Sequence, residues 1–146
     1  MQHRIDFYTA SPDALKAMIA LDTAVSKLPL EKPLIELVKL RASQINGCSF
    51  CVDMHTADAR KAGETERRLY AVSVWRETPF FTPRERAALA WTESLTQLSQ
   101  THAPDEDYEQ AAAHFTPKEL VDLTVAICTI NSWNRLAVGF RKMPQE

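Results

Sequence analysis

The sequence predicts an all-α fold, and three observations support this. Only three of its 146 residues are glycine. Ala, Leu, Glu, Lys and Arg, which are good helix formers, dominate the composition. The alternation of Val, Ile, Thr and Tyr that is typical of strands is nearly absent. Because 45% of the residues are hydrophobic and 25% are charged, as in ordinary globular proteins, we expect residues 1–146 to form one domain.

Helix start and stop signals divide the first part of the chain into three helices. Ser11 and Pro12 are typical of an N-cap and a first helical residue, and Leu28-Pro29-Leu30 ends that helix. The pair Asn46-Gly47 suits a helix end followed by a turn, and Gly63 suits the end of a later helix. The expected helices run over about 12–27, 31–46 and 49–61.

Two capping boxes organise the second part of the chain. Thr82-Pro83-Arg84-Glu85 and Thr116-Pro117-Lys118-Glu119 each combine an N-cap threonine, a proline at the first helical position and a glutamate at the third. The polar segment Asn131 to Arg135 interrupts the apolar run of the last helix, so we expect a break there. The expected helices run over about 66–75, 83–99, 105–114 and 117–130, with a short closing helix to about residue 140.

The apolar residues of these helices are expected to form the core or a subunit interface. Leu98 is expected on a buried face, and Cys128, which lies within an apolar run, is expected to be an inert core thiol. Three histidines in polar surroundings have no expected role: His3, His102 and His114. The large aromatic residues expected in the core or interface are Trp75, Phe80, Phe81 and Trp91.

The stretch from Asn46 to His55 carries the chemistry. Cys48 and Cys51 lie three positions apart, and His55 follows Cys51 by four, so a helix places all three side chains on one face. Unpaired N–H groups and the positive end of the macrodipole in the first helical turn favour a thiolate. We therefore expect a site at which sulfur is reactive.

Glu36 is expected to belong to the same site. A tight turn joins its helix to the next one, so the two helices should lie side by side and antiparallel. Glu36 lies ~15 Å before the turn and His55 lies ~10 Å beyond it, so the two are at comparable depth. Glu36 is therefore a candidate partner for His55 or Cys51, and a carboxylate beside His55 would fix its tautomer and keep it basic.

These residues resemble a known family. Glu36, followed by Cys48-x-x-Cys51 and His55, is similar to the pattern of the alkylhydroperoxidase AhpD-like proteins of the carboxymuconolactone decarboxylase superfamily. The segment Asn131 to Arg135 also resembles that family. The resemblance implies a bundle of about seven to eight helices and a thiol peroxidase in which Cys51 attacks the peroxide and Cys48 resolves the sulfenic acid to a disulfide. His55 and Glu36 would then relay the proton.

Two features complicate this assignment. The best-known member of the family has a second histidine immediately before its second cysteine, where this chain has Phe50. Helix position alone favours Cys48 as the thiol of lower pKa, whereas the imidazole at i+4 favours Cys51. We follow the imidazole, because a base can deprotonate the thiol and carry the proton to the leaving oxygen, which a helix terminus cannot do.

Other interpretations of the motif remain. The two cysteines could be small buried residues, and Glu36 could be an ordinary solvated helix residue. One cysteine pair and one histidine fall short of the four ligands of a structural zinc site. Two other functions are a non-enzymatic redox sensor, which Phe50 favours, and an enzyme like carboxymuconolactone decarboxylase, which would need a base and a cation rather than a dithiol.

Charge and hydropathy limit the partners. The net charge of −2 gives no reason to expect nucleic acid, and no apolar run approaches the ~20 residues of a membrane span. The charged first residues do not form a signal peptide, so a cytoplasmic location is expected. We expect no bound cofactor, a peroxide substrate and an external dithiol reductant, either a dihydrolipoyl protein or a thioredoxin-like one. The resemblance and the aromatic content also imply a homo-oligomer, a hexamer or a trimer.

Overall fold

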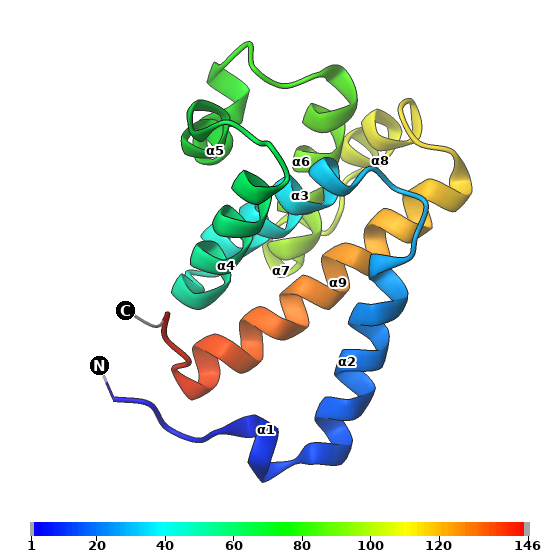
Figure 1. Ribbon diagram of the computed structural model, residues 1–146. Helices are drawn as coiled ribbons and strands as arrows, with labels where there is room; N and C mark the ends of the chain where they lie inside the picture. The colour runs from blue at the N-terminus through cyan, green and yellow to red at the C-terminus, as the bar shows by residue number, and fades with distance from the viewer. Residues whose placement is uncertain (1, 145–146) are drawn as a thin grey trace.

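The computed structural model describes residues 2–144, and every regular element among them is a helix (Figure 1). Nine are α-helices and one is a 3₁₀-helix, η1, so the predicted all-α class is confirmed and the helix count is slightly above the expected seven to eight. The elements are α1 (Phe7–Ala10), α2 (Pro12–Ser26), α3 (Lys32–Ile45), α4 (Ser49–Lys61), α5 (Glu66–Ala71), η1 (Val72–Glu77), α6 (Pro83–Thr96), α7 (Leu98–Thr101), α8 (Asp105–Ala112) and α9 (Pro117–Phe140).

Helix caps form as the sequence predicts. The Thr82 hydroxyl accepts a hydrogen bond from the Glu85 N–H at 3.2 Å, and the Glu85 carboxylate accepts one from the Thr82 N–H at 2.8 Å. Thr116 and Glu119 form the same reciprocal pair at the start of α9. Each box satisfies two backbone donors that a helix end otherwise leaves unpaired, which fixes where α6 and α9 begin.

Helix α9 differs most from expectation, because it is continuous from Pro117 to Phe140. The predicted break over Asn131 to Arg135 is wrong. The Asn131 side chain donates to the Ile127 carbonyl at 2.9 Å, and the Ser132 hydroxyl donates to the Cys128 carbonyl at 3.0 Å. These bonds to the preceding turn satisfy the polar groups within the helix, so the chain has no need to leave it.

Smaller differences occur elsewhere. The helix expected over 83–99 ends at Thr96 and a separate short helix, α7, follows. Leu98 at its start is 51% exposed, so its predicted burial is wrong. The helix expected over 66–75 changes to a 3₁₀-helix at Val72, and α1 was not expected.

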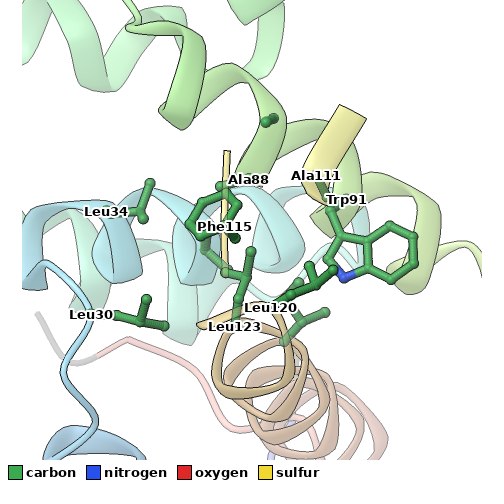
Figure 2. Close-up of a cluster of buried hydrophobic side chains, with 11 residues drawn as sticks. Leu30, Leu34, Ala88, Trp91, Ala111, Phe115, Leu120 and Leu123 are labelled. Carbon is green, nitrogen blue, oxygen red and sulfur yellow. The ribbon is translucent and has the colours of Figure 1, made fainter. Parts of the chain in front are cut away.

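Helix α3 lies at the centre of the molecule, between two groups of buried side chains. Leu34 and Val38 pack with α6, α8 and α9, and Figure 2 shows Leu34 close to Phe115 and Ala88 in this group. Leu37 and Leu40 pack on the other side, with α4, α5, η1 and α6. Burying each leucine contributes roughly 1.5–3 kcal/mol, so α3 is a rigid support for the side chains that it presents.

The aromatic residues belong mainly to this core. Trp75, Phe81 and Trp91 are buried within the chain itself, and Phe80 is half-buried against them. Of the two expected positions, core and interface, the structure therefore places the first three in the core. Over residues 2–144, the structure contains no helix with the length and apolar character needed to cross a membrane.

Candidate active site

The α3–α4 turn places the two predicted thiols. Gly47 adopts a left-handed φ of 66°, which reverses the chain at low steric cost, and the Cys48 N–H donates to the Ser43 carbonyl at 2.9 Å. Cys48 is the N-cap of α4, and its sulfur accepts a hydrogen bond from the Cys51 N–H at 3.3 Å. The sequence thus sets Cys48 at the electropositive start of α4 and Cys51 in its first turn.

Cys48 and Cys51 are joined by a disulfide. Their Cα atoms are 5.3 Å apart, within the usual ~4.4–6.8 Å for a bridged pair. Both residues are almost inaccessible, with exposed fractions of 1% for Cys48 and 2% for Cys51, and they pack against Ala137 of α9. The pair is therefore held where a disulfide can form without moving the backbone.

Glu36 and His55 form a close pair across the α3–α4 hairpin. A Glu36 carboxylate oxygen lies 2.9 Å from Nδ1 of His55, at the depth that the antiparallel arrangement predicts. Burial raises the pKa of the Glu36 carboxyl, but the hydrogen bond to His55 and the charges of His55 and Lys39 outweigh it, so this pKa lies below its ordinary value.

The ionised Glu36 decides the tautomer of His55. A carboxylate can only accept hydrogen bonds, so Nδ1 carries the proton that it shares with Glu36. In a neutral imidazole this leaves Nε2 unprotonated, with its lone pair available as a base. The arrangement is that of a general base oriented by a carboxylate.

A cavity of about 370 Å³ opens beside this pair. Glu36, His55 and Cys51 all line it, whereas Cys48 does not. A molecule in the cavity therefore lies against Cys51 and not against Cys48. The cavity brings three of the four predicted site residues together around one space.

Five further residues of the cavity were not predicted to belong to the site. Phe7, Tyr8, Phe50, Trp133 and Lys142 line its walls, and they come from α1, α4, α9 and the segment after α9. Phe50 therefore contributes an apolar wall where the family's best-known member has a histidine. Of the polar segment 131–135, Trp133 is the residue that reaches this cavity.

The asparagines of that segment hold α9 against the α3–α4 turn. The Asn46 side chain donates to Asn131 at 3.0 Å and to Asn134 at 2.9 Å. Asn134 in turn donates to the Ser43 hydroxyl at 3.0 Å and is buried. These bonds connect α9 to side chains at the end of α3, and they fix the turn that carries the thiols.

Replacing Asn134 with alanine should destabilise the protein by about 1–3 kcal/mol, because Asn46 and Ser43 would each lose one hydrogen-bond partner in a mainly buried network. Denaturant unfolding monitored by circular dichroism would measure the change. Ser132→Ala is the matched control, since it removes only a bond to a carbonyl of its own helix and should change stability by less than about 0.5 kcal/mol. Equal stability of the two variants would contradict this role of Asn134.

The remaining predicted residues lie apart from the cavity. Cys128 is exposed on α9, so its predicted burial in the core is wrong. The error arises because the helix turns this position of the apolar run outward. His3, His102 and His114 are also exposed. Within residues 2–144, no group of three or more His, Cys, Asp or Glu side chains is arranged to hold a metal ion.

Comparison with known proteins identifies the family. The sequence profile of the Carboxymuconolactone decarboxylase family matches residues 12–94, which include α2 to α5 and most of α6. The chain belongs to this family. The matched range contains the turn, both cysteines of the disulfide, Glu36 and His55.

The relatives of this protein include an AhpD protein. The chain is 41% identical to the uncharacterized protein YdfG of Bacillus subtilis over 95% of both chains. It is 36% identical to the alkyl hydroperoxide reductase AhpD of Hyphomonas neptunium over 44% of this chain and 33% of that one. The predicted resemblance to AhpD is confirmed.

Solved structures extend the comparison to the whole fold. A protein of unknown function from Agrobacterium tumefaciens, described as a candidate AhpD antioxidant defence protein, has a TM-score of 0.96 and 49% identity, covering 99% of this chain and all of that one. The debrominase Bmp8 shares the fold at 18% identity, with a TM-score of 0.82, covering 94% of this chain and 74% of that one. The same helical architecture therefore carries different chemistries.

Proposed function

We propose that this protein is a thiol-dependent peroxidase that reduces alkyl or hydrogen peroxides through Cys51 and Cys48. The observation that carries the proposal is the single cavity in which Cys51 lies with the Glu36–His55 pair. A redox-active cysteine pair needs a thiolate, and a base oriented by a carboxylate supplies one. The relationship to AhpD supports the same class of reaction.

In the first step, the Cys51 thiolate attacks the outer oxygen of the peroxide. The O–O bond breaks, Cys51 becomes a sulfenic acid, and the remaining alkoxide leaves as an alcohol after taking a proton. His55 is the proposed donor of that proton, which it first removed from the Cys51 thiol. One equivalent of peroxide is thereby reduced by two electrons.

In the second step, the Cys48 thiol attacks the sulfenic sulfur of Cys51. Water leaves, and the disulfide that the structure contains is formed. An external dithiol then reduces this disulfide by thiol–disulfide exchange and is itself oxidised. A dihydrolipoyl protein or a thioredoxin-like protein is the proposed reductant.

The lining of the cavity supports this division of roles. The helix start and the N–H of Cys51 stabilise negative charge on Cys48, which by itself favours Cys48 as the nucleophile. However, the cavity reaches Cys51 and not Cys48, and a nucleophile must contact its substrate. A stabilised thiolate at Cys48 suits the second, intramolecular step equally well.

We also propose that the protein works as a homo-oligomer. Helix α9 exposes Val121, Val125 and Cys128 on one side, and Leu98 of α7 is exposed as well. Leu98 and Cys128 line a second cavity, of about 670 Å³, between α7 and α9. Apolar side chains that gather on a surface in this way favour contact with another chain.

Steady-state peroxide consumption tests the proposed activity. With hydrogen peroxide or tert-butyl hydroperoxide and either dihydrolipoamide or a thioredoxin system, the protein should consume many equivalents of peroxide per chain. Cys128→Ser should consume peroxide at the wild-type rate, because its thiol is outside the cavity. Oxidation that stops after one disulfide per chain with every reductant would instead support the redox-sensor alternative.

A further inference from the structure

The ammonium group of Lys142 lies among three aromatic rings at the wall of the active-site cavity. Its nitrogen is 4.5 Å from the ring centre of Tyr8, 4.5 Å from that of Phe50 and 5.5 Å from that of Phe7. All three distances lie within the ~6 Å range of a cation–π interaction. We call these three rings the aromatic cage.

The aromatic cage is supported independently of Lys142. The rings of Phe7 and Tyr8 lie 4.7 Å apart, and Tyr8 stacks on Trp133 at 6.4 Å. Phe50 is placed by α4, next to Cys51. The rings therefore belong to helices α1 and α4 and are braced by α9, whereas Lys142 belongs to the segment after α9.

The side chain of Lys142 can move out of the cage while its backbone stays in place. Its backbone N–H donates to the Ala137 carbonyl at 2.8 Å, which closes the end of α9 and fixes the backbone position. The side chain beyond is a flexible four-carbon stem with a compact charge at its tip. Rotation about this stem removes the ammonium group from the cage without moving any helix.

The electrostatic surroundings favour a cation in this space. Glu36, Asp22 and Asp58 line the cavity, and Lys39, which also lines it, lies 3.9 Å from the Glu36 carboxylate. Glu36 is paired with His55, and Asp58 with Lys61, whereas Asp22 makes no ion pair with any residue from 2 to 144. Burial raises the pKa of the Tyr8 phenol, and the carboxylates of Asp6 and Asp22 raise it further, so these two negative charges act on the Tyr8 side of the cage.

We propose that the aromatic cage is a binding site for a small organic ammonium ligand, and that Lys142 is an internal occupant that such a ligand displaces. The ligand would place its cationic group among the rings of Phe7, Tyr8 and Phe50. Its apolar body would occupy the cavity of about 370 Å³, between Ile19 and Trp133. If Lys142 served only to hold the segment after α9, the aromatic cage would not need an open cavity beside it or the carboxylate of Asp22 in the cavity wall.

This site goes beyond the proposed peroxidase activity and does not depend on it. A ligand in the cage would lie in the same cavity as Cys51, so it would limit access to that sulfur whether or not the sulfur reacts with peroxide. Binding and protection of a thiol can both be measured without any turnover. If the protein proves not to be a peroxidase, the proposed ammonium site is unaffected. If no ammonium ligand binds, the peroxidase proposal is unaffected.

The test uses choline and its uncharged isostere 3,3-dimethylbutan-1-ol. Lys142→Ala vacates the cage, and this variant should bind choline, measured by isothermal titration calorimetry, at least roughly tenfold more tightly than the isostere. The wild type should bind choline several-fold more weakly than Lys142→Ala, because the lysine competes for the rings. In a reduced Cys128→Ser background, choline should also slow alkylation of Cys51.

Matched variants separate the cage from a general apolar site. Phe50→Leu, combined with Lys142→Ala, keeps apolar bulk but removes a ring, so it should weaken choline binding several-fold and leave the isostere unchanged. Tyr70→Leu removes a ring that is 72% exposed and outside the cavity. It should change neither the affinity for choline nor that for the isostere. If circular dichroism shows that Lys142→Ala is unfolded, the same measurements are made on Lys142→Met, which keeps an apolar side chain of similar length without the charge. Equal binding of choline and the isostere, or no saturable choline binding to the vacated cage, would overturn the proposal.

Discussion

A sulfenic-acid trap should label the Cys48→Ser variant after one equivalent of peroxide and should leave Cys51→Ser unlabelled. In Cys48→Ser, the nucleophile and its base remain, but no thiol is close enough to resolve the sulfenic acid, which should persist or oxidise further. In Cys51→Ser, the Cys48 thiol does not line the cavity, so its oxidation should be nearly absent. Mass spectrometry of the trapped peptide measures both outcomes.

Cys128 must be removed in both variants of this experiment. It is exposed and would otherwise contribute its own adduct, so each substitution is made in a Cys128→Ser background. The wild-type pair in that background is the reference and should yield a disulfide within one peptide. Trapping of Cys48 in the Cys51→Ser variant would show that the N-terminus of α4 outweighs His55, and the two roles would be exchanged.

Replacing His55 with alanine should slow the oxidation of Cys51 by roughly 10²–10⁴-fold, the usual effect of losing an acid–base group. The loss removes the base at Nε2 while leaving both thiols in place. Glu36→Gln should have a smaller effect, because a neutral amide can still accept the Nδ1 proton but no longer stabilises the imidazolium. Stopped-flow measurement of the change in tryptophan fluorescence on adding peroxide to the reduced protein gives the rate.

A second histidine variant controls for changes in net charge and stability. His114 is exposed and outside the cavity, so His114→Ala should react at the wild-type rate. Because the pKa of Glu36 lies below its ordinary value, its carboxylate is ionised at neutral pH. A fall in the wild-type rate at acidic pH, as the Glu36 carboxylate gains a proton, should therefore be absent in Glu36→Gln. Equal rates for His55→Ala and the wild type would contradict the proposed base.

The local part of the site could be predicted from the sequence because it lies within one helical hairpin. The spacing of Cys48, Cys51 and His55 fixes their common face once α4 is a helix, and the observed bounds of α4, Ser49–Lys61, are the predicted ones. Glu36 follows from the short turn, which determines the depth at which two antiparallel helices face each other. The capping boxes at Thr82 and Thr116 were recognisable for the same reason, since all of their contacts are local.

The other parts depend on contacts that no local pattern records. Asn131 and Ser132 are less favourable within a helix than apolar residues such as Leu, yet bonds to Ile127 and Cys128 keep them in α9. Lys142 reaches Tyr8 across almost the whole length of the sequence. The sequence pattern showed Phe50 only as the replacement of a histidine, because its contact with Lys142 joins residues far apart in the chain.

The meeting of the two ends has a consequence for the order in which the molecule assembles. The Arg4 N–H donates to the Phe140 carbonyl at 3.1 Å, and the Arg4 side chain donates to Gly139, so this wall of the cavity closes only when distant segments meet (Figure 1). The α3–α4 hairpin closes a much shorter loop than the contact between Arg4 and Phe140 does, so its formation costs less chain entropy. We therefore expect the thiols to acquire their base early in folding, before the wall that restricts their access exists. During that interval the cysteine pair would be open to oxidants of any size, so a selectivity that the finished cavity imposes would be acquired later than the proposed reactivity of the thiols.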